Sequence, residues 1–136
     1  MGGGWLDGPG TLIVRPTDGR EPARIPVEVA TSFRARSRGL LGRLSFPGRA
    51  MLLTPASGVH TFRMRMPIDV AYLDGGMSVI AVRTMRPGRW GLPRPRARHV
   101  LEAEAGAMAR WGVLPGTRVE VAAARRTPRP RRRLPR

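Results

Sequence analysis

Apolar and polar residues alternate most clearly in the stretch VHTFRMRMPIDVAYLD, at residues 59–74. Its first half predicts a strand that places four side chains on one face, those of His60, Phe62, Met64 and Met66. Pro67 cannot donate a hydrogen bond to a β-ladder, so it marks a bend or a sheet edge. Residues 68–73 predict a second strand, apolar except for Asp69. We expect the rest of the chain to pack around these two strands.

Shorter patterns on both sides predict the other elements. Strands are expected at residues 11–14, 24–30, 50–53, 77–82, 98–103 and 117–122. One helix is expected at residues 33–44, capped by Thr31 or Ser32, and another at residues 104–111. Residues 84–98, which include three prolines, predict a long loop. The fold class is therefore α+β, with a strongly bent, mostly antiparallel sheet or a small β-barrel of about seven strands and two short helices.

The 136 residues form one domain, which we place at residues 11–124. Residues 1–10 are rich in glycine and are expected to be a flexible N-terminus. Residues 125–136 are rich in arginine, have little to bury, and are expected to be a disordered tail. No signal peptide or membrane-spanning stretch is recognisable, which predicts a cytoplasmic protein without a membrane partner. We expect this protein to be a monomer.

Arginine accounts for the whole net charge of +16, because all 25 basic residues are Arg and Lys is absent. GC-rich codons favour Arg over Lys, so this excess does not by itself indicate a phosphate partner. Seven of the arginines lie in the tail, and others surround Trp90 in the expected loop. A weak, sequence-independent contact with nucleic acid is therefore an alternative function. It would use Trp90, Arg94, Arg96, Arg125, Arg126, Arg131, Arg132 and Arg133.

Three segments resemble the landmarks of the DUF192 family of small prokaryotic proteins. Residues 59–74 are similar to the family signature V-H-T-F-x-M-R-x-P-I-D-V-x-F-L-D. Residues 36–43 match R-x-R-G-L-x-x-R, and residues 100–106 match V-L-E-x-x-x-G. Arg63 departs from the signature, where the family more often has Gly or an aromatic residue, and this departure would alter any pocket at that position. The resemblance covers residues 25–122 and implies neither a reaction nor a ligand.

His60 and Asp69 are candidates for acid–base chemistry, since histidine titrates near neutral pH. The alternative for both is a structural role, with His60 satisfied by a backbone group and Asp69 paired with a cation. A carboxylate in an apolar strand needs such a partner, because an unpaired buried charge costs several kcal/mol. Glu102, which lies between two apolar residues, leads to the same expectation. The candidate partners of Asp69 are Arg65, Arg38 and Arg36.

Several kinds of site have no support in the sequence. The chain has no Cys, which excludes disulfides and thiolate chemistry. The two His residues do not have the spacing of a metal motif. Neither a G-x-S-x-G elbow nor a glycine-rich phosphate loop is present. We therefore expect no metal and no cofactor.

The favoured function is a non-enzymatic module that binds a small ligand or a protein partner. Its cleft would be gated by residues 84–98 and lined by six side chains, those of His60, Phe62, Met64, Arg65, Asp69 and Glu102. Polyanion binding through the tail and the Trp90 loop is the alternative. An acid–base enzyme that uses His60 and Asp69 is the third interpretation, so binding is favoured over catalysis.

Overall fold

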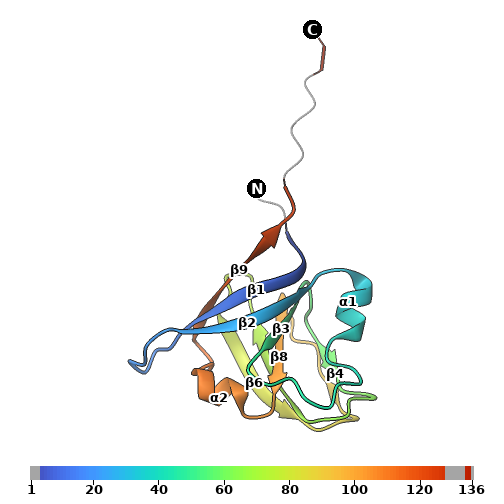
Figure 1. The fold of residues 1–136 in the computed structure, drawn as a ribbon, viewed down its shortest axis with the longest axis vertical. Coiled ribbons are helices and arrows are strands. Elements are labelled where there is room, and N and C mark those ends of the chain that lie inside the picture. Colours follow the sequence, from blue (N-terminus) through green and yellow to red (C-terminus); the bar gives the residue numbers. More distant parts are fainter. Residues whose placement is uncertain (1–3, 128–133, 136) are drawn as a thin grey trace.

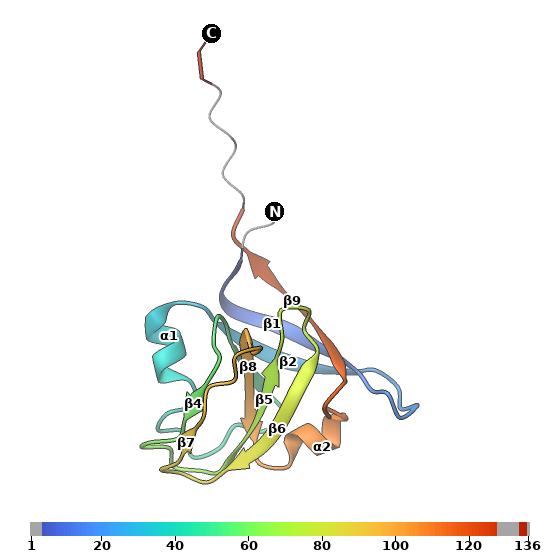
Figure 2. The same ribbon diagram turned by 180° about the vertical axis from the view of Figure 1, so that it is seen from behind.

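The computed structural model describes residues 4–127, 134 and 135, whose fold is a bent sheet with two short helices (Figure 1, Figure 2). Seven strands pair in the order β6-β5-β8-β3-β2-β1-β9. Two further strands, β4 (Val59–His60) and β7 (Trp90–Gly91), form a separate pair, and the helices are α1 (Phe33–Arg38) and α2 (Ala107–Trp111). The strands of the main sheet are β1 (Trp5–Arg15), β2 (Ala23–Ala30), β3 (Ala50–Leu53), β5 (Ile68–Leu73), β6 (Val79–Met85), β8 (His99–Glu104) and β9 (Arg118–Arg125).

The main sheet stays open, so the predicted α+β class and bent sheet are confirmed, whereas the barrel is not formed. Its pairs are antiparallel except for β2 with β3. The two edge strands approach each other at a bridge between Ser78 and Arg118. Beyond that bridge they separate, because β9 runs along β1 while β6 runs along β5. The sheet is therefore strongly curled without closing.

Strand alternation divides the buried side chains between the two faces of the sheet. In β5, Leu73 joins a first hydrophobic cluster and its neighbour Tyr72 joins a second one. Met108 of α2 packs into the first cluster, and Phe46 packs into the second. All residues of β5 are buried, as expected for a strand covered on both faces. This division decides which polar side chains can meet.

β1 begins at Trp5, so the prediction of a flexible N-terminus is wrong for residues 5–10. Trp5 packs against the first cluster, and the guanidinium group of Arg125 lies 4.3 Å from its ring centroid. Gly10 allows β1 and β9 to pair closely, because a Cβ atom there would lie 2.7 Å from the carbonyl oxygen of Ala122. Gly10 therefore serves close strand packing rather than flexibility.

The C-terminal boundary also differs from the prediction. β9 extends to Arg125, and the backbone N–H of Arg126 donates to the carbonyl oxygen of Gly4 at 2.7 Å. The disordered tail expected from residue 125 onward is therefore wrong at its first two positions. The remaining ends of the chain lie outside the described residues, at positions 1–3, 128–133 and 136.

Both helices are shorter than their patterns predicted. Ser32 caps α1, as expected, by accepting a hydrogen bond from the backbone N–H of Ala35. The helix ends at Gly39, whose φ of 44° lies in the left-handed region. Residues 40–42 then continue as a turn, and Phe33 at the start of the helix stays 79% exposed. The predicted continuous helix to residue 44 is therefore wrong.

We expect removal of residues 1–10 to destabilise the domain, because it strips Trp5 from the first cluster. Burial of a large aromatic side chain contributes about 2–3 kcal/mol, so the free energy of unfolding should fall by at least that amount. Urea denaturation measures the loss, and Trp5→Ala should reproduce most of it. The neighbouring Leu6 is 41% exposed and supplies the control, since Leu6→Ala should be close to neutral. An unchanged urea midpoint for the truncated chain would support a flexible N-terminus instead.

Candidate functional site

Three segments that are far apart in the sequence meet at one small pocket, which we call the Glu102 pocket. They are the same three segments that resemble family landmarks. The pocket has a volume of about 100 Å³. Since a water molecule occupies about 30 Å³ in the liquid, the pocket holds a group of a few heavy atoms. Its lining includes Arg36, Arg38, Gly39, His60, Met64 and Glu102.

The carboxyl group of Glu102 is the most unusual group in this pocket. The side chain is 1% exposed, and its Oε1 atom has no hydrogen-bond partner among the described residues. Burial raises the pKa of Glu102 to about 7, while a hydrogen bond from the backbone of Leu40 opposes the rise. A carboxyl group with this pKa gains and loses its proton near neutral pH. It can therefore donate or accept a hydrogen bond under ordinary conditions.

Gly39 lets the backbone after α1 approach this carboxyl group. A Cβ atom at Gly39 would lie 2.9 Å from Oε1 of Glu102, which is closer than real Cβ contacts occur. The φ of 44° at Gly39 also favours glycine. Gly39 therefore both ends the helix and permits close packing against Glu102.

Arginine surrounds the pocket without neutralising Glu102. Arg36 is held by carbonyl oxygens, since its Nε donates to Thr31 at 3.1 Å and its Nη1 donates to Pro55 at 3.0 Å. Arg38 is exposed at the end of α1. No ion pair involving Glu102 is found within residues 4–127. Positive charge therefore lies at the rim of the pocket, and a protonatable carboxyl group lies at its base.

The first half of the signature stretch is less regular than the predicted strand. β4 ends at His60, and the chain turns at Arg63, whose φ is 63°. His60 and Met64 both line the pocket, but Phe62 is 41% exposed and stacks on the His60 ring with 5.2 Å between centroids. Met66 is buried in the second cluster. The prediction that these four side chains share one face is therefore wrong, because the turn interrupts the alternation.

The positive φ at Arg63 gives a physical reason why glycine suits this position. Arg63 is exposed and lies outside the lining of the pocket, so the pocket is not altered by this residue. A side chain in the left-handed region is strained, and Arg63→Gly should therefore raise the free energy of unfolding by about 0.5–1 kcal/mol. Arg65→Gly is the matched control and should not stabilise the protein. Chemical denaturation distinguishes the two variants. An Arg63→Gly protein that is less stable than the parent would show that the backbone at residue 63 is not strained by a side chain.

Comparison with known proteins now identifies these segments. The model of the DUF192 family, described as Uncharacterized ACR, COG1430, matches residues 13–121. The chain belongs to the DUF192 family. A UPF0127 protein of Pyrococcus abyssi is 34% identical over 100 residues, which cover 69% of this chain and 84% of the relative. A UPF0127 protein of Pyrococcus horikoshii is 32% identical over 84 residues, which cover 59% of this chain and 73% of the relative.

Two solved structures share the fold of this DUF192 domain. A Sinorhizobium meliloti protein named as a "putative transcription regulator" has a TM-score of 0.74 and 21% identity, covering 87% of this chain and 95% of that one. A protein of unknown function from Novosphingobium aromaticivorans has a TM-score of 0.71 and 23% identity, covering 81% and 83%. At these identities the likeness shows the fold alone.

In the DUF192 domain, Asp69 and Glu102 lie on opposite faces of the sheet. β5 pairs with β8 so that Val70 is directly opposite Glu102. Strand alternation therefore turns Asp69 away from the Glu102 pocket and toward α2. The predicted cleft that contains both carboxyl groups is wrong. The predicted acid–base pair is wrong as well, because His60 lines the pocket that Asp69 does not reach.

Asp69 instead fastens α2 to the sheet. Its side chain is 3% exposed and accepts three hydrogen bonds. The donors are Oγ1 of Thr84 at 2.7 Å and the backbone N–H groups of Gly106 and Met108 at 2.9 and 3.1 Å. These neutral donors replace the guanidinium group that we expected. The prediction of an arginine partner is wrong for all three candidates, Arg65, Arg38 and Arg36.

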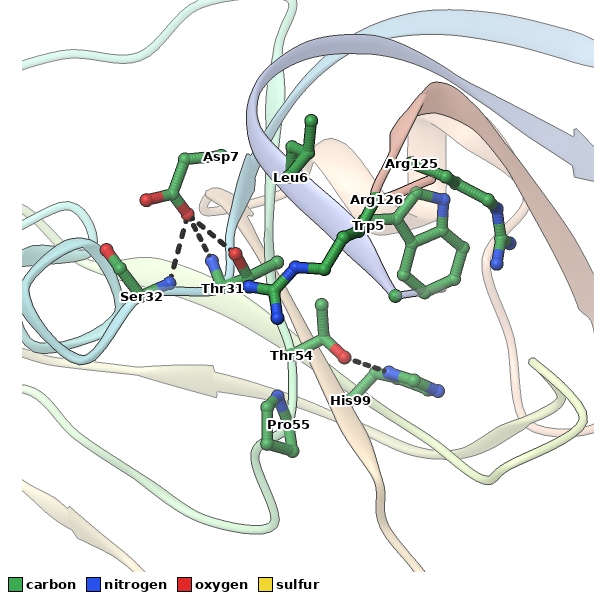
Figure 3. Close-up of a pocket in the computed structure, with 11 residues that line it drawn as sticks. Trp5, Leu6, Asp7, Thr31, Ser32, Thr54, Pro55, His99, Arg125 and Arg126 are labelled. Carbon is green, nitrogen blue, oxygen red and sulfur yellow. Dashed lines mark hydrogen bonds between the residues drawn. The ribbon is translucent and has the colours of Figure 1, made fainter. Parts of the chain in front are cut away.

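A larger hollow, of about 730 Å³, lies where the start of β1 meets the end of β9 (Figure 3). Asp7 accepts hydrogen bonds from the backbone N–H groups of Thr31 and Ser32 at 2.5 and 3.0 Å. Hydrogen bonds from Ser32 and Thr31 lower the pKa of Asp7 well below its usual range. Nδ1 of His99 lies 2.7 Å from Oγ1 of Thr54. These polar groups already have partners, so we interpret the hollow as the place where β1 is fastened to the domain.

The residues predicted to bind polyanions do not form one surface. Trp90 and Arg94 line a cleft beside β6 and β7, whereas Arg125 and Arg126 line the hollow at the other end of the molecule (Figure 2). Arg96 lines neither of these depressions. The prediction that tail and loop act together is therefore not supported by the described residues. The predicted polyanion-binding set also includes three residues that lie outside the described part of the chain, namely Arg131, Arg132 and Arg133.

Sequence reasoning also missed residues at the cleft beside Trp90 and at the Glu102 pocket. Arg83 lines the cleft beside Trp90 and was not considered, because it precedes the loop expected at residues 84–98. Arg36 and Arg38 were considered only as partners of Asp69. Their match to a family landmark could have placed them beside Glu102, which belongs to another landmark.

Two negative findings concern the described residues alone. No helix within residues 4–127 is both long and apolar enough to cross a membrane. In the same part of the chain, no group of three or more His, Cys, Asp or Glu side chains gathers where it could hold a metal ion.

Proposed function

We propose that this DUF192 protein binds a small polar ligand, or the polar end group of a partner molecule, in the Glu102 pocket. One observation carries the proposal. Oε1 of Glu102 is buried in a pocket and has no hydrogen-bond partner among the described residues. Buried polar atoms without partners are rare, because each one costs about 1–3 kcal/mol. A ligand that donates a hydrogen bond to this oxygen would offset that cost.

The charge and size of the pocket restrict the ligand. A hydroxyl, amide or ammonium group can donate to Glu102. Arg38 and His60 at the rim favour an acceptor or a negative charge on the part of the ligand that stays outside. The volume of about 100 Å³ limits the inserted part to a few heavy atoms. A short group that carries a hydrogen-bond donor next to a carboxylate fits these three restrictions.

Acid–base catalysis is the second candidate, because Glu102 has a pKa of about 7 and shares its pocket with His60. This pair would replace the pairing of His60 with Asp69. Binding is favoured because the missing partner of Oε1 is sufficient for it, whereas catalysis also requires a reacting group. Turnover of a bound compound, lost in both Glu102→Gln and His60→Gln, would establish the catalytic function.

Backbone amide NMR tests the binding function. Glycolate, glycine, oxamate and β-alanine represent the ligand class, because each carries a hydrogen-bond donor close to a carboxylate. We expect at least one of them to shift the amide signals of Gly39 and Leu40 at millimolar concentration. Glu102→Gln removes the charged hydrogen-bond acceptor of the pocket, and Arg38→Gln removes a positive charge at its rim. Each substitution should weaken ligand binding about tenfold. The exposed Glu21 supplies the control, and Glu21→Gln should bind as the parent does. Absence of such shifts for all four compounds, or binding by both pocket variants that is as tight as binding by the parent, would contradict the proposal.

A further inference from the structure

A second depression, separate from the Glu102 pocket, gathers positive charge. It is a cleft of about 550 Å³ beside β6 and β7, and no acidic side chain is among its lining residues. None of its lining residues also lines the Glu102 pocket. We call it the Trp90 cleft. Its lining includes Tyr72, Arg83, Arg86, Arg89, Trp90 and Arg94.

The four arginines of the cleft keep their charge available. None of them forms an ion pair within the described part of the chain. Arg94 lies over the ring of Tyr72, with 4.8 Å from its guanidinium carbon to the ring centroid. Its Nε atom is buried and has no hydrogen-bond partner among residues 4–127. A buried donor without a partner, in a cleft that lacks carboxylates, indicates a site for an anionic ligand.

Trp90 adds a flat apolar surface to this positive charge. Its side chain is 67% exposed, which is unusual for a residue that proteins normally bury. Phe62 supports it, with 5.8 Å between the ring centroids, and His60 stacks on Phe62 in turn. An exposed tryptophan beside arginines can stack on a planar ring while the arginines bind a phosphate group.

Residues 86–89 form a turn at the edge of the cleft that carries Arg86 and Arg89. Thr61, which is fully buried, holds this turn in place. Its hydroxyl group donates to the carbonyl oxygen of Arg86 at 2.6 Å and accepts from the backbone N–H of Arg89 at 2.8 Å. The backbone of Thr61 also bonds to Gly88 and Arg89, at 2.7 and 2.8 Å. These four hydrogen bonds fix the backbone that carries Arg86 and Arg89, so only the arginine side chains have to be ordered on binding.

From these observations we infer that the Trp90 cleft binds a nucleotide unit, with its phosphate on Arg86 and Arg89 and its base on Trp90. The volume of the cleft lies within the range of about 300–1,000 Å³ that is typical of small-molecule sites. The unit could be a free nucleotide or part of a single strand, since both present the same phosphate and base. Arg125 and Arg126 line the hollow at the end of β9, which lies far from β7 in the molecule (Figure 2), so they are not part of this site.

Titration calorimetry at low salt, with thymidine 5′-monophosphate and hexathymidylate as probes, tests the inference in the full chain. Loss of two charge-assisted contacts should weaken binding of both probes at least about tenfold in Arg86→Gln/Arg89→Gln. The matched control is Arg24→Gln/Arg34→Gln, which removes the same charge from exposed positions outside the cleft and should bind within about twofold of the parent. Trp90→Ala should weaken the nucleotide about fivefold or more and leave inorganic phosphate unchanged.

The two probes also distinguish the source of the unit. Tighter binding of hexathymidylate than of the mononucleotide assigns the cleft to single strands, and equal affinities assign it to free nucleotides. The inference is wrong if the parent binds neither probe at millimolar concentration. It is also wrong if the two double variants bind equally well. Thermal melts of all variants confirm that the exposed substitutions leave the fold intact.

Discussion

Asp69→Ala is expected to lower the free energy of unfolding by about 3–5 kcal/mol, a large share of the stability of a small domain. The substitution leaves the backbone N–H groups of Gly106 and Met108 and the hydroxyl group of Thr84 without their acceptor. A buried donor without an acceptor costs about 1–3 kcal/mol, and this cost applies in full to Met108. The hydrogen bonds of Gly106 and Thr84 are partly buried, so each adds a smaller cost. Because these bonds join α2 to β5 and β6, the loss should appear as one cooperative shift in a urea denaturation curve.

Asp69→Asn separates geometry from charge at this position. The amide oxygen can accept from both backbone N–H groups, and the amide nitrogen can donate to Oγ1 of Thr84. We therefore expect a smaller loss, of about 1–2 kcal/mol. Asp18 is exposed and bonds only locally, to Arg20, so Asp18→Ala should be close to neutral. If Asp69→Ala melts like Asp18→Ala, then Asp69 does not fasten α2 to the sheet.

Glu102→Gln is expected to make the protein less sensitive to pH. Burial raises the pKa of Glu102 from 4.5 to about 7, so the folded state binds this proton more tightly than the unfolded state does. The stabilisation is complete below pH 4.5 and is lost as the pH rises to about 7. A change of this size corresponds to roughly 3 kcal/mol. Glutamine carries no such proton, so the stability of the variant relative to the parent should increase by that amount between these pH values.

The measurement is a series of urea denaturation curves between pH 4 and pH 8 for the parent and its variants. Burial lowers the pKa of His99, which therefore also makes stability depend on pH, but His99 is present in both proteins and cancels in the difference. Glu21→Gln, at an exposed position, should follow the parent at every pH. A constant difference between Glu102→Gln and the parent across the range would show that Glu102 does not titrate as a buried acid.

The local sequence was sufficient where a short apolar segment is bounded by turn residues. Residues 68–73 were predicted as a strand and form β5 with the same bounds. The segment after Asp74 was predicted to contain a strand at residues 77–82, and β6 covers Val79–Met85. A short apolar run between Pro67 and the Gly75-Gly76 pair is the cause for β5, because a run of this length bounded by turn residues is typical of a strand buried on both faces.

The local sequence was insufficient where contacts between distant strands decide the outcome. Asp69 and Glu102 were placed in one cleft, but the register that sets Val70 opposite Glu102 assigns them to opposite faces. That register depends on the whole sheet. Gly10 was interpreted as flexible because its close neighbour, Ala122 in β9, is more than one hundred residues away in the chain. Long-range pairing of this kind leaves no local signal.

Sites with unsatisfied groups were only partly predictable for a related reason. Glu102 was selected because it interrupts an apolar strand, and the structure confirms that it is buried. Its missing partner at Oε1, however, depends on how closely Gly39 approaches. The family resemblance located all three segments of the pocket. Their convergence on one carboxyl group became visible only in the folded chain.

The most direct test of the Glu102 pocket is a pH titration of the Glu102 side-chain carboxyl carbon by ¹³C NMR, assigned by the signal that Glu102→Gln removes. We predict a pKa of about 7 in the free protein. Addition of a compound that donates a hydrogen bond to Oε1 should then lower this pKa, because such a bond favours the charged form. A free-protein pKa at the ordinary value of 4.5, or a pKa that no compound of the four-member panel changes, would contradict the account.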